Sequence, residues 1–340
     1  WDDTATAGPG SSTTGLLNNT LYTFVWNSSI DLPDKYNTTV YIRIIPHDNI
    51  GSGTPSQIGP FTVDNKAPVF LTPPTIEVTD TTAWINWTVN ESAEASVWYG
   101  FTQITPILTT ETIGSSGSTF QSVQLTSLQP GRDYTFIINS TDPQGNKNSS
   151  DPTTYTFKTE IRIYLYKGWN MISFPPYFLI GGTIPNTLIS IAGQYDAVQA
   201  YYPNDPGDPW KHYREGKPYG NDLLDLDEVH GFWIHMRNDS VLIPDHEDPT
   251  TDIFFPGYTT VLLQRGWNFV GYPSVTNRNV VDALLGVPYD MVQTYDAASG
   301  QWLSYDPGGY SLDNLSQMEM GKGYWIHLTS NFHMWDVDYI

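Results

Sequence analysis

Short runs of alternating apolar and polar residues recur through the first half of the chain, and clusters of Gly, Pro and Asn separate them. Alternation with a period of two predicts β-strands, because successive side chains of a strand point to opposite faces. The pattern predicts strands in the first 66 residues over 21–26, 39–45 and 58–63. Further strands are predicted over 75–78, 83–89, 95–99, 122–125 and 134–138.

The second half of the chain contains one pattern twice. Gly168-Trp169-Asn170 opens the first copy and Gly266-Trp267-Asn268 opens the second, 98 residues later. The copies close on Gly231-Phe232-Trp233-Ile234-His235 and on Gly323-Tyr324-Trp325-Ile326-His327, which are 92 residues apart. A repeat of about a domain's length predicts two related domains, and it argues against a solenoid of short units.

Each copy has the pattern of strands around one short helix. In the second copy we expect Asn279 to cap a helix over 280–285, with Gly286 ending it. In the first copy Pro185 is expected to start the equivalent stretch and Gly193 to end it. Two aromatic hairpins are also predicted, over 198–202 with 210–213 and over 292–295 with 302–305.

These patterns together predict an all-β chain. Tandem β-sandwich domains come first, and two homologous, mainly-β modules with one short helix each follow. The predicted boundaries are a partial sandwich over 1–66, a complete sandwich over 67–159, the first repeat copy over 160–256 and the second over 257–340.

Residues 67–159 resemble a fibronectin type III domain. The resemblance is carried by Trp87 on the second strand, by Pro130-Gly131 ahead of Tyr134, and by Asp142 with Gly145-Asn146 in the last long turn. It implies that Trp87 fills the core of the sandwich and that Tyr134 is a corner tyrosine. Both roles are structural.

Residues 1–66 resemble the closing strands of a sandwich module that is common in large surface proteins of archaea and bacteria. The matching segments are Phe24-Val25-Trp26, Val40-Tyr41-Ile42-Arg43-Ile44 and Gly59-Pro60-Phe61-Thr62-Val63-Asp64-Asn65. The opening strands of such a module are missing. We therefore expect either a longer parent polypeptide or another subunit to supply them.

The two repeat copies resemble Gly-Trp-Asn modules found near the ends of secreted and surface-layer proteins, especially in archaea. That family is defined more by location than by activity. Four tryptophans mark the copies, and we expect them to be structural residues sealed inside the modules: Trp169, Trp233, Trp267 and Trp325.

Composition narrows the partners. The 340 residues include 36 acidic and 15 basic ones, which gives a net charge of −21. No basic stripe is present to neutralise phosphates, so a nucleic-acid partner is disfavoured. Cysteine is absent, which excludes disulfides and thiolate metal sites. No apolar run approaches the roughly 18 residues that a membrane-spanning helix needs.

Sequons for N-linked glycans are frequent, and most of them lie in the first half of the chain. They predict an exported, cell-surface protein that carries glycans. The acceptors would be Asn18, Asn27, Asn37, Asn86, Asn90, Asn139, Asn148, Asn238 and Asn314.

Metal sites and catalytic sites have weaker support. His230 and His235 are five positions apart on a strand and so point to opposite faces, which favours a packing role beside Trp233 for His235. Oxygen ligands for Ca²⁺ gather around Asp142 with Asn146 and around Asp225 with Asp227, although none follows the spaced calcium loop. No hydrolase or phosphate-binding motif is present, and a pair of glycosidase carboxylates is left open.

The sequence therefore predicts an extracellular structural or adhesive protein without enzymatic activity or a required cofactor. We expect it to self-associate into a surface layer or filament through contacts between β domains. The alternative is a non-catalytic accessory region of a secreted hydrolase, in which exposed aromatic residues would bind polysaccharide.

Overall fold

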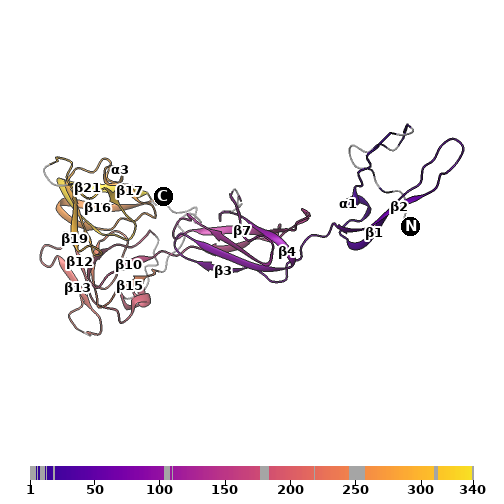
Figure 1. Cartoon of the computed structure of the whole chain (residues 1–340). Coiled ribbons are helices and arrows are strands. Elements are labelled where there is room, and N and C mark those ends of the chain that lie inside the picture. The colour runs from indigo at the N-terminus through magenta and orange to yellow at the C-terminus, as the bar shows by residue number, and fades with distance from the viewer. Residues whose placement is uncertain are drawn as a thin grey trace.

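The computed structural model describes residues 5, 7, 12, 14–17, 20–102, 108, 110–176, 184–217, 219–244, 257–309 and 313–338. Figure 1 shows three parts that follow one another along an elongated molecule: an N-terminal hairpin, a β-sandwich, and the two repeat copies packed together. In the described residues, strands greatly outnumber the few short helices. The prediction of an all-β fold is confirmed.

The N-terminal part contains one helical turn, α1 (Ser28–Asp31), and a hairpin of β1 (Tyr36–Ile44) and β2 (Ser56–Asp64). No described residue before Pro68 is buried. The strand predicted over 21–26 is wrong, because the segment forms a single bridge, between Ala7 and Trp26, and Leu21 is 98% exposed. Alternation alone does not make a strand when no neighbouring strand lies alongside to pair with it.

The sandwich consists of strands β3 (Thr75–Val78), β4 (Ala83–Phe101), β5 (Thr110–Ile113), β6 (Ser118–Leu125), β7 (Asp133–Thr141), β8 (Lys147–Ser149) and β9 (Tyr155–Lys158). The sequence predicts two strands where β4 runs continuously. The first half of β4 pairs with β3 and β6, and its second half pairs with β5 and β7. Because β4 crosses from one layer to the other, a three-stranded sheet faces the sheet built on β7. This is a β-sandwich, the architecture that fibronectin type III and immunoglobulin domains share.

Two aromatic residues fix this sandwich. Trp87 is 1% exposed, and its indole N–H donates to Ser140 Oγ at 3.0 Å. The hydroxyl of Tyr134 accepts a hydrogen bond from the backbone N–H of Gln129 at 2.9 Å, five residues upstream. That contact is the tyrosine corner of such sandwiches.

The two repeat copies have the same topology. The first contains β10 (Ile163–Leu165), β11 (Gly168–Ile172), α2 (Ile184–Thr187), a 3₁₀ turn η1 (Ile189–Ile191), β12 (Tyr195–Tyr201), β13 (Trp210–Arg214), β14 (Phe232–Met236) and β15 (Ser240–Leu242). The second contains β16 (Tyr258–Val270), β17 (Arg278–Asn279), α3 (Val280–Ala283), β18 (Tyr289–Asp296), β19 (Gln301–Tyr305), β20 (Gln317–Met318) and β21 (Tyr324–Asp338). Their main sheets have the orders β11-β14-β12-β13 and β16-β21-β18-β19.

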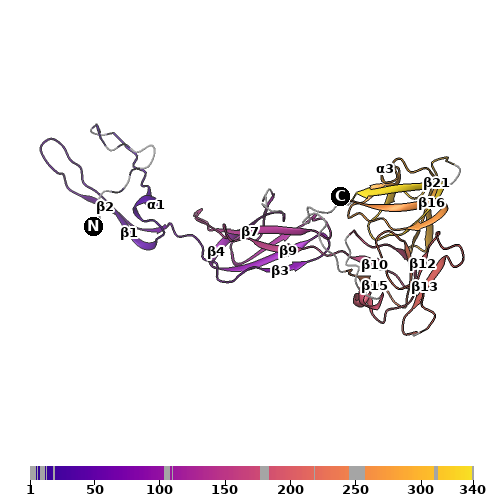
Figure 2. The same ribbon diagram turned by 180° about the vertical axis from the view of Figure 1, so that it is seen from behind.

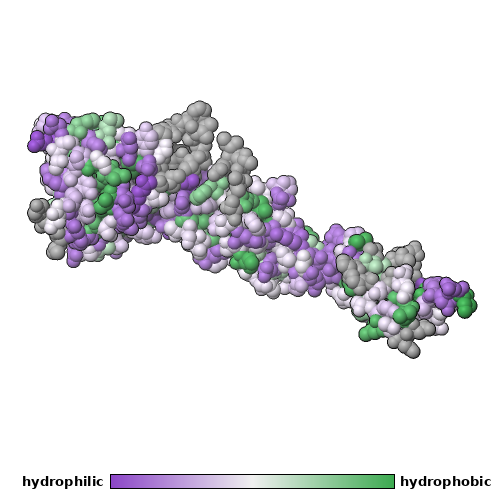
Figure 3. All heavy atoms as spheres, turned by 90° about the horizontal axis from the view of Figure 1, so that it is seen from above, coloured by the Kyte–Doolittle hydropathy of each residue, from purple (hydrophilic) through white to green (hydrophobic). Residues whose placement is uncertain are grey.

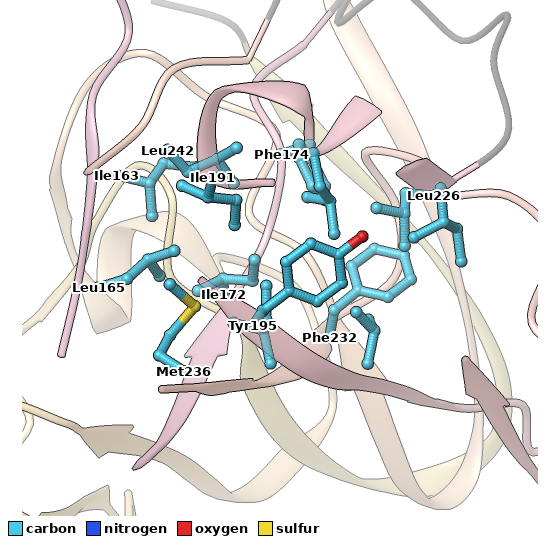
Figure 4. Close-up of a cluster of buried hydrophobic side chains, with 14 of the residues drawn as sticks. Ile163, Leu165, Ile172, Phe174, Ile191, Tyr195, Leu226, Phe232, Met236 and Leu242 are labelled. Carbon is cyan, nitrogen blue, oxygen red and sulfur yellow. The ribbon is translucent and has the colours of Figure 1, made fainter. Parts of the chain in front are cut away.

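Each copy has its own apolar core on one face of its main sheet. On β14 the side chains of Phe232, Ile234 and Met236 are fully buried in that core, which Figure 4 shows in close-up. Trp233 and His235 alternate with them and therefore point to the opposite face. The expected side-chain cap of Asn279 is wrong, because its side chain makes no capping hydrogen bond to α3.

The Gly-Trp-Asn motif begins β11 in the first copy and follows a β-bulge within β16 in the second, and its asparagine holds the local backbone. Gly168 and Gly266 have φ values of +97° and +92°, which favour glycine. The buried amide of Asn170 accepts a hydrogen bond from Tyr166 N at 2.8 Å and donates to the carbonyls of Tyr166 and Gly168. Asn268 makes the equivalent bonds in the second copy. The side chain of the tryptophan between the glycine and the asparagine takes no part in these hydrogen bonds.

Candidate functional site

The outer faces of the two main sheets pack against each other, and we call this contact the inter-copy interface. Figure 2 shows both copies together at one end of the molecule. Ile172 bridges to Lys322, and the equivalent residues His230 and Val270 also bridge. The backbone bonds come in pairs as well, since Ser173 N donates to Gly321 O and Gly271 N donates to Val229 O, each at 2.9 Å. The copies are thus related by an approximate twofold axis, as in an isologous dimer.

Aromatic side chains fill this interface with the same symmetry. Trp233 of the first copy packs on Tyr295 and Trp302 of the second, with ring centroids 5.6 and 5.8 Å apart. Trp325 packs on Tyr201 and Trp210 of the first copy at 5.2 and 6.0 Å. Trp233 and Trp325 therefore have a structural role at the contact between the two modules. The sequence pattern predicted instead that each lies inside its own module.

Two glycines allow the sheets to approach closely. A Cβ on Gly323 would lie 2.7 Å from the carbonyl oxygen of Ile172, and a Cβ on Gly231 would collide with the ring of Phe269. Both glycines precede the aromatic closing strand of their own copy. Glycine at these positions is thus required by the partner copy and not by the local backbone.

The tryptophans of the two Gly-Trp-Asn motifs are not buried. Trp169 is 38% exposed and Trp267 is 40% exposed, which corrects the expectation of full burial. They lie on the same outer faces of the sheets as Trp233 and Trp325, but they remain accessible to solvent. Each lies opposite a histidine of the neighbouring strand, Trp169 against His235 and Trp267 against His327.

An aspartate completes the row on a third strand. His235 Nδ1 lies 2.8 Å from Asp196 Oδ1, and His327 Nδ1 lies 2.6 Å from Asp290 Oδ1. In each copy a β-bulge places the aspartate as an extra residue opposite the histidine strand, which turns its side chain toward the ring. We call Trp169–His235–Asp196 and Trp267–His327–Asp290 the Trp–His–Asp rows. His235 thus packs against Trp169. Trp233, which the sequence named, lies two positions away on the same face of β14.

A small cleft of about 200 Å³ lies between the copies. Pro203 and Asn204 of the first copy and Thr260 and Leu262 of the second are among its lining residues. His230 is the one titratable side chain in that lining, and its Nδ1 lies 2.7 Å from Asp227 Oδ2. Glycoside hydrolysis by the usual route needs two carboxyl groups flanking the substrate, and the described residues that line this cleft include no carboxyl group.

Three carboxylates meet where the hairpin joins the sandwich. Asp64, Glu91 and Asp142 lie close enough for one oxygen of each to contact a common cation. Burial and the charges of Asp64 and Asp142 raise the pKa of Glu91. Of the predicted calcium ligands, Asp142 is in this group, while Asn146 donates its amide to Asp142 Oδ2 at 2.8 Å. The sequence pattern did not predict that Asp64 and Glu91 lie beside Asp142.

The other predicted calcium ligands form no such group among the described residues. Asp227 accepts hydrogen bonds from the backbone of Val229 and His230, in addition to its contact with the imidazole of His230. Asp225 is exposed. A cation site at this pair has no geometric support.

The predicted glycan acceptors differ in accessibility. Asn139 is 2% exposed, with its amide nitrogen 3.4 Å from Ser96 Oγ, so the prediction of a glycan there is wrong for this fold. Asn18 lies outside the described residues. Partly buried acceptors are Asn27, Asn86 and Asn148, and exposed ones are Asn37, Asn90, Asn238 and Asn314.

No family model matches this chain, and no curated protein sequence does. A solved structure, the crystal structure of chicken CNTN1 FN1-FN3 domains, is similar over 78% of this chain and 98% of that chain. The identity is 15% and the TM-score is 0.20, so the similarity adds nothing to the strand pairing described above. Among the described residues, no helix is both long enough and apolar enough to cross a membrane.

Proposed function

We propose that this chain is an extracellular structural and adhesive protein that assembles into a surface layer or filament through contacts between β domains. It would carry N-linked glycans at its exposed sequons and would have no catalytic role. The observation that carries the proposal is the hairpin of β1 and β2, a two-stranded sheet that no other strand of the described residues joins and whose apolar face keeps Ile44 and Ile58 exposed.

The apolar face is defined by strand pairing. Val40 pairs with Phe61 and Ile42 pairs with Ile58, and cross-strand partners share a face. Ile44 lies two positions beyond Ile42 on the same side. Ile44 and Ile58 are 57% and 60% exposed. Figure 3 shows apolar patches at this end of the molecule. A two-stranded sheet is at best marginally stable in water, so we expect a second layer to cover this face.

Strands from outside the described chain would provide that layer. Among the described residues β1 and β2 pair with each other alone, so each retains a free edge. An added strand would satisfy the backbone groups of such an edge, and its side chains would cover the apolar face. Repeated from one subunit to the next, this exchange would build a polymer.

The test is a comparison of two neighbouring substitutions on β2. Ile58→Asp puts a charge on the apolar face, whereas Gln57→Asp puts the same charge on the opposite face, where Gln57 pairs with Arg43. Sedimentation velocity over a range of concentrations, with electron microscopy of the products, would follow assembly. We expect the wild type and Gln57→Asp to form ordered oligomers and Ile58→Asp to remain monomeric.

Two results would contradict the proposal. One is a wild-type chain that remains monomeric at the highest concentration tested. The other is assembly that Ile58→Asp leaves unchanged, since polymer contacts would then lie elsewhere on the molecule. Intact mass before and after deglycosylation tests the glycan part separately, and a bare polypeptide mass would contradict it.

A further inference from the structure

We propose that the two Trp–His–Asp rows are equivalent binding sites for a neutral saccharide. This inference goes beyond assembly and does not depend on it, because the rows lie on the repeat copies and the proposed assembly surface lies on the N-terminal hairpin. Each site would stack a sugar ring on the exposed indole and hold its hydroxyl groups with the histidine and the aspartate.

The same geometry occurs twice. The rings of Trp169 and His235 have centroids 5.0 Å apart with an interplanar angle of 63°, and those of Trp267 and His327 have 5.0 Å and 60°. Each exposed tryptophan also meets the partly buried tryptophan of its own copy edge to face, Trp169 against Trp233 at 6.2 Å and Trp267 against Trp325 at 6.3 Å. The partly buried tryptophan thus supports the exposed one.

The polar part of each row is accessible and already oriented. The side chains of His235 and His327 are 35% and 34% exposed, and those of Asp196 and Asp290 are 43% and 56% exposed. The contact within each pair uses Nδ1 and one carboxylate oxygen. The Nε2 atom and the second oxygen are the atoms that would meet the hydroxyl groups of a ligand. Pre-oriented polar groups beside an aromatic platform lower the cost of ordering the site on binding.

The bulges separate this arrangement from simple surface packing. A regular strand would not turn the aspartate toward the histidine, and each copy interrupts its ladder at the same point. Trp84 of the sandwich provides the contrast, since it is 42% exposed on β4 but lies opposite Glu77 and Gln124, with no histidine–aspartate pair beside it. An exposed tryptophan on this protein therefore does not require such a row.

The row favours a neutral sugar over charged ligands. An anionic sugar would meet Asp196 or Asp290 on a chain whose net charge is −21. A cationic peptide would reach the carboxylate only beside the histidine, which lies between the indole and the aspartate and already contacts that carboxylate. Aromatic stacking together with hydroxyl-binding groups of both donor and acceptor type suits an uncharged, hydroxyl-rich ligand.

The experiment is isothermal titration of the whole chain with a panel of neutral hexasaccharides: cellohexaose, laminarihexaose, mannohexaose and chitohexaose. We expect at least one of them to bind at two equivalent sites per chain. Trp169→Ala and Trp267→Ala should each reduce the stoichiometry from two to one, and the double variant should bind at least about tenfold more weakly. Trp169→Tyr keeps an aromatic face and should retain both sites, and Trp84→Ala should bind like the wild type.

Other outcomes overturn the inference. Absence of binding by every member of the panel would do so, as would a double variant that still binds at two sites with the affinity of the wild type. Binding of a lysine-rich peptide that is lost in Trp169→Ala, with no sugar binding, would assign the rows to a cationic partner instead. Thermal melting of each variant distinguishes unfolding of the protein from loss of a binding site. Trp169→Tyr should retain binding at both sites and should melt at the same temperature as the wild type.

Discussion

Two sheet surfaces of this molecule carry large apolar side chains outside any domain core, and they differ in how far the rest of the chain covers them. The outer faces of the repeat copies cover each other, so that Trp233 and Trp325 find aromatic partners within the same chain. The β1–β2 hairpin forms a two-stranded sheet by itself among the described residues, and Ile44 and Ile58 on its apolar face are 57% and 60% exposed. Where duplication supplies a second copy, the surface closes internally. Where it does not, we propose that a partner from outside the described chain covers the surface.

The comparison also indicates how the two kinds of surface contribute to stability. Contacts between the copies are part of the folded chain, so breaking them should lower its free energy of unfolding. Contacts of the hairpin would be intermolecular, so changes there should alter assembly and leave the stability of the dilute monomer nearly unchanged.

The largest effect is expected when the aromatic contacts of the interface are removed. Trp325→Ala deletes the ring that packs on Tyr201, Trp210 and Phe269, and it should lower the free energy of unfolding by about 3 kcal/mol or more. Trp233→Ala should have a similar effect because of the approximate twofold symmetry. Urea unfolding followed by circular dichroism measures both.

Trp84→Ala is the matched control, since this exposed tryptophan should contribute within about 0.5 kcal/mol. If Trp325→Ala were no more destabilising than Trp84→Ala, the inter-copy interface would be a weak contact. The contrast with the hairpin would then be lost.

A smaller effect is expected when the two sheets are forced apart. Gly323→Ala places a methyl group against the carbonyl of Ile172, and the strain should cost about 1–3 kcal/mol. Gly257→Ala is the control, because its added methyl would meet no atom within 4 Å and its backbone is not in the left-handed region. Thermal melting compares the two variants, and equal melting temperatures would argue against close packing at Gly323.

Much of the fold could be predicted from the sequence, because alternation and turn residues are local signals. The hairpin strands, the strand carrying Tyr134 and the aromatic hairpins of both copies lie close to their expected places. The continuity of β4 and the failure of 21–26 to form a strand depend on which other strands lie alongside. That information is not contained in one segment.

The site was harder to predict for the same reason. The repeated Trp-Ile-His and Tyr-Asp pairs were visible, yet they are separated in sequence and meet because β11, β12 and β14 are neighbours in one sheet. The partial burial of Trp233 against the other copy, with Trp169 left exposed, depends on how the two modules dock. A signal was available in the repetition of Asp196 as Asp290, which follows a repeated tyrosine in both copies.

The smallest effect concerns the junction between the uncovered hairpin and the complete sandwich. The pKa of Glu91 is raised above its usual value of 4.5 by burial and by the charges of Asp64 and Asp142. The folded protein therefore binds the proton more tightly than the unfolded chain, so stability is lost as the pH rises from 4.5 through the folded-state pKa. In the presence of a chelator, Glu91→Gln should raise the stability at neutral pH by up to about 1 kcal/mol. That gain should vanish below pH 4.5.

Glu94→Gln is the control, because Glu94 is exposed on the same strand, β4. Thermal melting between pH 4 and pH 7 distinguishes the two variants, and a Glu91→Gln protein that melts below the wild type in chelator would contradict the argument. Added calcium sharpens the test. A cation held by Asp64, Glu91 and Asp142 would stabilise the folded state that binds it, and Glu91→Gln would remove one ligand. If calcium reverses the sign of the substitution, the junction is a cation site that stiffens the link to the hairpin. If it leaves the sign unchanged, the three carboxylates are a local electrostatic strain.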